Sequence, residues 1–251
     1  MSALQQNWDL RAALNFMLGG AGAGLLAACA LLRQPDLPLM VGLGMTGAGL
    51  AAVWLEIGRK LRALHVLFNP RTSWMTRESY AALLLLASGS GSIFVPQVLP
   101  LAAVAALAFL YCQARILREA KGIPAWRARE VVPLVICTGL AEGLGLALML
   151  TAEGHLALLL AAAVIARAIA WRRYRAVVTT AALAHADRAL LQLGTIATLA
   201  LAAASWLLPV LAPLAGIAAV AAGWQLKLDL VTRAAFKQEF TLPRLPVRGT
   251  R

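Results

Sequence analysis

Residues 54–80 have the sequence WLEIGRKLRALHVLFNPRTSWMTRESY and form the longest polar interruption in the first half of a very apolar chain. An acid lies near each end of the stretch, at Glu56 and Glu78. The basic side chains within it are Arg59, Lys60, Arg62, Arg71 and Arg77. Long apolar runs adjoin it on both sides. Such a stretch is either a solvated loop between two membrane helices or the mouth of a site.

The composition indicates an integral membrane protein. The chain has 251 residues, of which 61% are hydrophobic and 14% are charged, and its mean hydropathy is +0.76. Apolar runs of about 20 residues recur, which is the length of helix needed to cross a hydrocarbon core about 30 Å thick. Because backbone polar groups in lipid must be satisfied internally, continuous apolar runs predict helices. We therefore expect an all-α membrane protein.

The order of the apolar runs predicts eight transmembrane helices in a single membrane domain, residues 1–251. The expected spans are 12–32, 39–57, 79–94, 98–117, 131–151, 156–171, 189–207 and 210–226. The first four, within 12–117, are expected to pack as one four-helix half and the last four, within 131–226, as a second. Residues 227–251 would form a tail. Glycines at positions 19, 20, 22 and 24, and at 42, 44, 47 and 49, predict close helix contacts.

The charge distribution predicts the orientation of these helices. The net charge is +12, and an even number of spans puts both termini on one face. Every Lys and Arg except Arg33 then falls on that face, which the positive-inside rule assigns to the cytoplasm. We interpret the basic charge as topology and not as nucleic-acid binding. The long connections on this face carry Trp74, Trp126 and Trp171, which indicates either interfacial anchoring or a docking surface for a partner.

The residues that could bind haem or a metal are poorly placed for it. His65 and His185 fall in predicted loops and His155 in a turn on the opposite face, so they do not form an axial pair within the bilayer. The cysteines lie in apolar runs without a C-x-x-C spacing. We expect no haem, no metal site and no catalytic residue in this chain.

Several polar residues fall inside or at the ends of the spans. Glu142 lies well within the fifth span, and an intramembrane carboxylate is a functional-site candidate, here a possible proton relay. Near the cytoplasmic ends of the first four spans lie Asn15, Glu56, Glu78 and Gln113, within reach of Arg62 from the loop. Such groups suit a quinone head group, which needs hydrogen-bond donors, protons and access from lipid. Alternatively, the acids simply pair with arginines at helix ends.

The stretch after the second span resembles a loop of the dimethyl sulfoxide reductase membrane-anchor family, part of the wider polysulfide-reductase (NrfD-like) superfamily. That loop has the form H-L-G-x-P-x-R, followed by a serine-containing turn and a glutamate that opens the third span. The matching residues here are Glu56-Ile57-Gly58-Arg59-Lys60-Leu61-Arg62, then Ser73 and Arg77-Glu78. Glu56 departs from the family's histidine. The first span and the segment QEFTLPRLPVRG also resemble anchors of phenylacetyl-CoA:acceptor oxidoreductases.

The resemblance implies a function. Anchors of this family hold a molybdopterin catalytic subunit and an iron–sulfur subunit at the membrane and exchange electrons with ubiquinone or menaquinone, without binding the substrate themselves. By position, Gly58, Arg62 and Glu78 match quinone-site residues, and Glu56, Asn15 and Trp74 are added as candidates. We expect a bacterial cytoplasmic (inner) membrane protein with its partners on the cytoplasmic face. The alternative is a haem-free secondary transporter with an intramembrane carboxylate, which predicts an inverted repeat.

Overall fold

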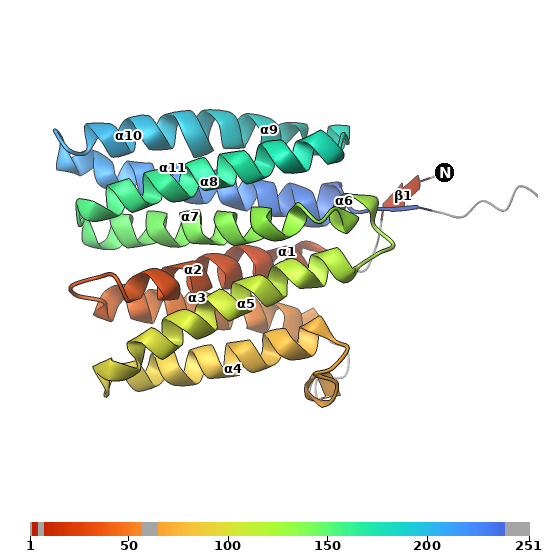
Figure 1. Ribbon diagram of the computed structural model, residues 1–251, viewed down its shortest axis with the longest axis horizontal. Coiled ribbons are helices and arrows are strands. Elements are labelled where there is room, and N and C mark those ends of the chain that lie inside the picture. The colour runs from red at the N-terminus through yellow and green to blue at the C-terminus, as the bar shows by residue number, and fades with distance from the viewer. Residues whose placement is uncertain (1, 5–7, 57–64, 239–251) are drawn as a thin grey trace, which may run out of the picture.

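The computed structural model describes residues 2–4, 8–56 and 65–238, and almost all of them are helical (Figure 1). Long helices lie side by side along the longest dimension of the molecule and connect at its two ends. Two short strands, β1 (Ser2–Leu4) and β2 (Phe236–Gln238), pair antiparallel, with Ala3 opposite Lys237. The first and last described segments therefore meet at one end of the bundle. The all-α prediction is confirmed.

The described residues in the first half of the chain form four long helical rods. The first rod is continuous from α1 (Leu10–Leu14) through a π-helical segment, η1 (Asn15–Gly19), into α2 (Gly20–Cys29). It begins where the Asp9 carboxylate accepts hydrogen bonds from the backbone N–H groups of Arg11 and Ala12. The other rods are α3 (Asp36–Glu56), α4 (Trp74–Ser92) and α5 (Leu99–Glu119), the last preceded by the 3₁₀ turn η3 (Pro96–Val98).

The second half contains four more rods after the short helix α6 (Pro124–Arg127). They are α7 (Val131–Thr151), α8 (His155–Val177), a composite rod, and a final rod. The composite rod consists of η4 (Ala181–Leu183), α9 (Ala184–Leu191), the π-helical segment η5 (Gln192–Ala197) and α10 (Thr198–Ala204). The final rod consists of η6 (Pro209–Leu211), α11 (Ala212–Leu228) and the π-helical segment η7 (Asp229–Arg233).

Among the described residues, six helices are long and apolar enough to cross a membrane. They are Leu10–Cys29, Asp36–Leu55, Pro96–Glu119, Val131–Thr151, His155–Val177 and Pro209–Arg233. The other two expected spans, 79–94 and 189–207, are helical up to Ser92 in α4 and up to Ala204 in the composite rod. Their polar segments, such as the first turns of α4 and the residues around His185, keep them out of that set. The protein is therefore a multi-pass membrane protein by helix length and composition.

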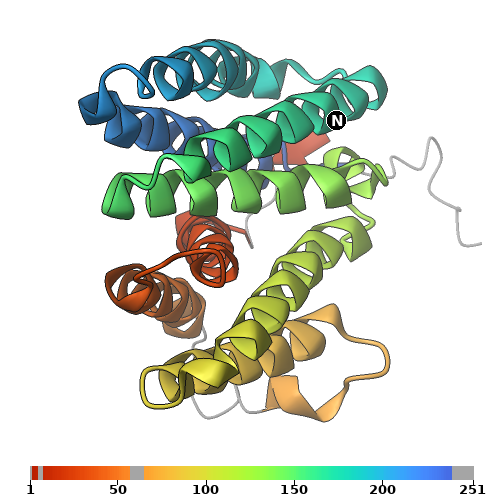
Figure 2. The ribbon, with the colours of Figure 1, turned by 60° about the vertical axis from the view of Figure 1, so that its left-hand side comes forward.

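The helices of the two halves lie on opposite sides of the molecule, with α1–α5 in red to yellow-green and α7–α11 in green to blue (Figure 2). The halves meet where α2 packs on α7. A Cβ atom on Gly24 would overlap the backbone of Gly139, and one on Gly143 would overlap the backbone of Gly24. Hydrogen in place of a side chain lets the two backbones touch, as the glycine spacing predicts. Gly44 and Gly47, by contrast, have no atom within 4 Å of such a Cβ.

Two basic residues lie elsewhere than expected. Arg167 and Lys227 were assigned to the basic cytoplasmic face, and Lys227 to the tail, yet their exposed fractions are 1% and 2%. The assignment of Lys227 to the tail was wrong because α11 continues to Leu228, past its apolar run. Arg167 lies within the expected span 156–171, in α8, and its side chain points into the bundle instead of toward the basic face.

Candidate functional site

A polar cluster in the first half joins three of the expected rods. The Asn15 Nδ2 group donates a hydrogen bond to Glu78 Oε1 at 3.3 Å, and Gln113 Nε2 donates to the backbone carbonyl of Asn15 at 3.1 Å. All three residues are buried, with exposed fractions of 6% for Asn15, 7% for Glu78 and 0% for Gln113. The structure thus brings together Asn15, Glu78 and Gln113, which sequence reasoning placed at one depth near the basic end of the helices.

The glycines of the first rod make room for this cluster. A Cβ on Gly19 would stand 2.9 Å from Asn15 Oδ1 and 3.3 Å from Gln113 Nε2. A Cβ on Gly20 would stand 2.6 Å from Lys227 Nζ and 3.1 Å from Gln113 Oε1. Because both positions are glycines, polar atoms from α5 and α11 approach the helix backbone directly. The ammonium group of Lys227 and the amide oxygen of Gln113 therefore lie close to each other beside Gly20.

A buried ion pair continues the polar contacts into the second half. Lys227 Nζ donates to Glu142 Oε2 at 2.5 Å, and Glu142 has an exposed fraction of 0%. Glu142 was predicted as a candidate from the sequence, but its partner Lys227 was not. Lys227 lies at the end of the last apolar run, where a lysine side chain can either extend to water or turn inward, so the sequence carries no signal that identifies it.

Arg167 supplies a second buried cation near Glu142. Its guanidinium group donates to the carbonyl of Ala219 at 2.9 Å and to the carbonyl of Gly194, in η5, at 2.6 Å. A Cβ on Gly194 would stand 2.7 Å from the same guanidinium. These carbonyl acceptors fix the side chain and tie α8 to α11 and to the π-helical segment of the composite rod. Arg167 was counted among the basic residues of the cytoplasmic face, although it falls within the expected span 156–171.

These six residues form what we call the buried polar row: Glu78, Asn15, Gln113, Lys227, Glu142 and Arg167. The row crosses the bundle from α4 through η1 and α5 to α11, α7 and α8. It contains two carboxyl groups and two cations. Within the described residues, Asn15 Oδ1, Gln113 Oε1 and Glu142 Oε1 are buried oxygens with no hydrogen-bond partner. Buried polar groups at membrane depth are costly and mark functional sites, so this row is the candidate site.

The remaining predicted quinone residues lie around the first half of the row. Trp74, at the start of α4, has the guanidinium groups of Arg77 and Arg115 each 4.2 Å from its ring centroid, and the Tyr111 ring packs edge-on at 5.6 Å. The Trp74 indole therefore makes cation–π contacts with two arginines of the same chain. Gly58 and Arg62 lie outside the described residues. Glu56 ends α3, and its side chain also falls outside the described part of the chain.

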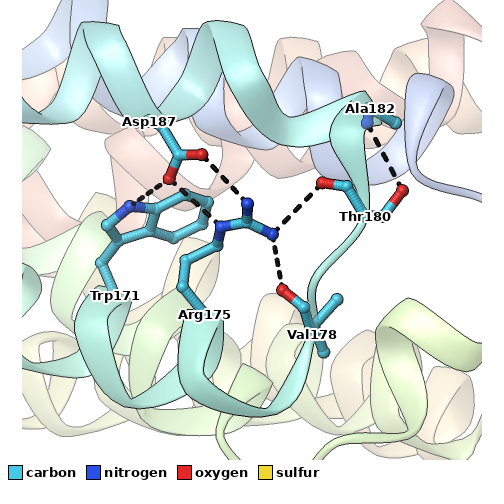
Figure 3. Close-up of polar contacts among 6 residues, drawn as sticks. All are labelled: Trp171, Arg175, Val178, Thr180, Ala182 and Asp187. Carbon is cyan, nitrogen blue, oxygen red and sulfur yellow. Dashed lines mark hydrogen bonds and ion pairs between the residues drawn. The ribbon is translucent and has the colours of Figure 1, made fainter.

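The other tryptophans that were noted as anchors or docking residues are structural. Trp126 is fully buried, and its indole N–H donates to the carbonyl of Leu230 at 2.8 Å. Trp171 donates to Asp187 Oδ1 at 3.0 Å, beside the two-pronged ion pair between Arg175 and Asp187 (Figure 3). Arg175 also donates to the backbone carbonyls of Val178 and Thr180. These hydrogen bonds stabilise the turn that connects α8 to α9.

A basic hollow of about 480 Å³ opens at the end of α5 where the chain turns toward α7. Its lining residues are Arg115, Arg118, Glu119, Lys121 and Arg127. Arg127 donates to the carbonyl of Lys121 and Arg115 is engaged by Tyr111 and Glu119, which leaves Arg118 and Lys121 as the cations with no such contact among the described residues. The hollow therefore presents positive charge at the basic end of the bundle.

Within the described residues, no group of three or more His, Cys, Asp or Glu side chains is arranged to hold a metal ion. The chain matches no protein-family model, and a comparison with curated proteins finds no significant match.

Proposed function

We propose that the chain is the membrane anchor and quinone-reactive subunit of a molybdopterin and iron–sulfur oxidoreductase in a bacterial cytoplasmic membrane. Electrons would pass from a partner's iron–sulfur cluster to ubiquinone or menaquinone, and the catalytic subunits would sit on the cytoplasmic face. The proposal rests on the resemblance of residues 56–78 and on one structural observation, which is the meeting of Asn15, Glu78 and Gln113 near the basic end of the helices.

Eight crossings, in two four-helix halves, are part of this proposal. Support comes from the succession of rods, which reverse direction at each connection along the bundle (Figure 1). With eight rods, β1 and β2 fall at the same end as α6, and Arg33 falls at the other, where its N–H donates to Glu153 Oε1 at 3.3 Å. Most of the basic residues that the structure describes then fall at the end that carries β1 and β2, as expected for a cytoplasmic face.

The first-half cluster has the chemistry that quinone reduction needs. A carbonyl of the head group accepts hydrogen bonds as it gains electrons, and the reduced oxygen takes up a proton. Asn15 and Gln113 are amide donors, and Glu78 is a carboxyl group that can deliver a proton. Gly58 and Arg62, which lie outside the described residues, are added to the proposed pocket on the resemblance alone. The exposed apolar faces of α4 and α5, such as Leu83 and Leu107, are suited to contact with lipid and a quinone tail.

The basic hollow supports docking of a cytoplasmic partner. Arg118 and Lys121 present charge that an acidic surface could neutralise, and electrostatic complementarity fixes the register of such complexes. An iron–sulfur subunit bound there would hold its nearest iron–sulfur cluster over the end of the bundle that contains Asn15, Glu78 and Gln113.

A secondary transporter remains the second candidate, and the specific observation in its favour is the ion pair between Glu142 and Lys227. Intramembrane charges on facing helices mark substrate or ion pathways in transporters. The broken helices expected of a transporter would correspond to the π-helical segments η1 and η5. Copurification separates the two functions. An anchor is expected to bring down a molybdenum-containing and an iron–sulfur subunit from its native membrane, whereas a transporter would be stable and active alone.

The quinone site is tested by replacing Glu78 with glutamine in the intact complex. Glu78→Gln keeps the side-chain size and removes the transferable proton. We expect quinone reduction to fall at least tenfold, in the range of general acid–base effects of about 10²-fold, while substrate oxidation with an artificial dye is unchanged. Glu153→Gln, at the opposite end, is the matched control and should leave both activities intact. Loss of both activities in Glu78→Gln would mean that this residue only holds the complex together.

A further inference from the structure

The two carboxyl groups of the buried polar row have different partners. In the described part of the chain, Glu78 is contacted by the amides of Asn15 and Gln113 and by no cation. Glu142 instead accepts a hydrogen bond from the Lys227 ammonium and also interacts electrostatically with the positive charge of Arg167. A buried carboxylate without a cation is costly, so Lys227 and Arg167 stabilise the ionised form of Glu142, whereas the described residues place no such cation at Glu78.

The Lys227 ammonium lies between these two environments. Its Nζ atom lies 2.5 Å from Glu142 Oε2. A Cβ atom placed on Gly20 would stand 2.6 Å from Lys227 Nζ and 3.1 Å from Gln113 Oε1, so both groups lie beside Gly20. That amide oxygen has no hydrogen-bond partner among the described residues. A lysine has three donors on a flexible stem, so a small rotation carries a donor from Glu142 to Gln113. Gly20 leaves this path clear because it has no side chain.

Gln113 links Lys227 to the Glu78 side. Its oxygen faces Lys227, while its Nε2 group donates to the Asn15 carbonyl and lies within hydrogen-bonding reach of Glu78. A donor placed on the amide oxygen polarises the amide and strengthens donation from its nitrogen. A positive charge at Gln113 therefore stabilises negative charge at Glu78.

We propose that Lys227 is a charge carrier that couples proton uptake at Glu142 to proton release at Glu78. When the Glu142 carboxylate takes up a proton and becomes a neutral acid, the ammonium, which keeps its own three protons, moves to Gln113 Oε1. Glu78 then releases its proton and becomes a carboxylate. One proton enters and one leaves, so the net charge of the row is unchanged, and no group is oxidised or reduced.

The neighbouring charged groups fit this exchange. Around Glu142, α11 contributes Lys227 and the Gly223 backbone, and α8 contributes Arg167. Arg167 is fixed by its two carbonyl acceptors and stays in place as Lys227 moves. Around Glu78, the other titratable neighbours among the described residues are the Cys112 thiol of α5 and Arg77. The Arg77 guanidinium is held on the carbonyls of Pro70 and Arg71.

The destination of the released proton rests on the proposed quinone pocket, but the coupling itself does not. It can therefore be measured by infrared spectroscopy on the full chain in lipid nanodiscs without quinone. The C=O stretch of a protonated carboxyl group is assigned by its loss in Glu78→Gln and in Glu142→Gln. We expect wild-type protein at neutral pH to show the Glu78 acid band and no Glu142 acid band.

Glu142→Gln imitates the protonated state and should free the ammonium. The Glu78 acid band is then expected to fall at least roughly twofold at neutral pH. In the double variant Glu142→Gln/Lys227→Met, which has no carrier, the band should return to its wild-type intensity. An unchanged Glu78 band in Glu142→Gln, or a band that stays reduced in the double variant, overturns the proposal.

A titration of the Glu78 acid band adds a measurement of the same coupling. In Glu142→Gln the band should appear at a lower pH than in wild-type protein, because the freed ammonium stabilises the Glu78 carboxylate. In Glu142→Gln/Lys227→Met the band should not appear at a lower pH than in wild type. Equal midpoints in wild type and Glu142→Gln reject the coupling. Normal quinone reduction in a protein with equal midpoints would reject the carrier and leave the proposed pocket standing.

Discussion

Asn15, in the π-helical segment of the first rod, donates a hydrogen bond to Glu78 on α4 at 3.3 Å, although 63 positions separate them in the chain. Both side chains are buried. Each group therefore satisfies the other in a place where water is largely excluded, and removal of one leaves the other without that partner.

The first prediction concerns this contact. Asn15→Leu should lower quinone reduction by the intact complex about tenfold, because removing one partner of a buried hydrogen bond costs roughly 1–3 kcal/mol. Quinol formation measures the effect. Ser88→Ala is the control, since buried Ser88 bonds only the Leu84 and Leu85 carbonyls of its own helix among the described residues. Equal losses in both variants would show that burial alone, and not the contact with Glu78, matters.

The second prediction concerns the ion pair in the second half. Glu142→Leu and Lys227→Met should each destabilise the protein by about 3–5 kcal/mol, because each leaves an uncompensated buried charge. The double variant should be more stable than the worse single variant. Denaturant unfolding in detergent micelles measures these free energies. Destabilisation of the double variant equal to the sum of the singles would mean that the two side chains do not interact.

The third prediction uses the glycine contact between the halves. Gly143→Ala should destabilise the protein by about 1–3 kcal/mol, because its methyl group would overlap the Gly24 backbone. Gly44→Ala has open space around it and should be neutral or stabilising by up to about 1 kcal/mol, as expected when alanine replaces glycine in a helix. Thermal unfolding compares the two. Equal stability of the two variants contradicts the close contact.

The fourth prediction concerns the turn in Figure 3. Arg175→Ala removes the donor to the carbonyls of Val178 and Thr180, and we expect hydrogen exchange of residues 178–183 to accelerate about tenfold, equivalent to about 1.4 kcal/mol. Asp187→Asn should have a smaller effect, because the ion pair is partly exposed and screened. Arg172→Ala, an exposed neighbour, is the control and should leave exchange in the turn unchanged.

The fifth prediction tests the basic hollow. The double variant Arg118→Glu/Lys121→Glu should release the iron–sulfur partner at lower salt than the wild-type complex, because like charges repel and the attraction is screened by ions. Gel filtration of the complex over a salt series measures the release. Arg33→Glu, at the opposite end, should behave as wild type. If all three proteins release the partner at the same salt concentration, the partner does not bind at the basic hollow.

Much of the fold could be predicted because apolar runs and their breaks determine the helices. The predicted fifth span, 131–151, coincides with α7. The first rod begins two residues early at Leu10, where Asp9 caps it. The ends of α8 and α11 could not be predicted from hydropathy, because arginine and lysine have good helix propensity and continue a helix after its apolar run ends.

The candidate site could be predicted in part. Counting residues from the span ends placed Asn15, Glu78 and Gln113 at one level, and the hydrogen bonds between them confirm it. The partner of Glu142 could not be predicted, because a lysine near a helix end can extend to water or turn inward, and its sequence position is the same in both cases. The assignments of Glu56, Gly58, Arg62 and Trp74 to a quinone pocket stay predictions.

The position of Lys227 on α11 also has a consequence for biogenesis. Glu142 enters the membrane with α7, but its cation is synthesised 85 residues later. At about 5–20 residues per second, α7 waits roughly 4–17 s for its partner. A chain that stops before α11 keeps an unmatched acid in its interior. The Glu142–Lys227 ion pair therefore forms only after α11 is synthesised, and chains truncated before α11 should be preferred substrates for membrane quality-control proteases.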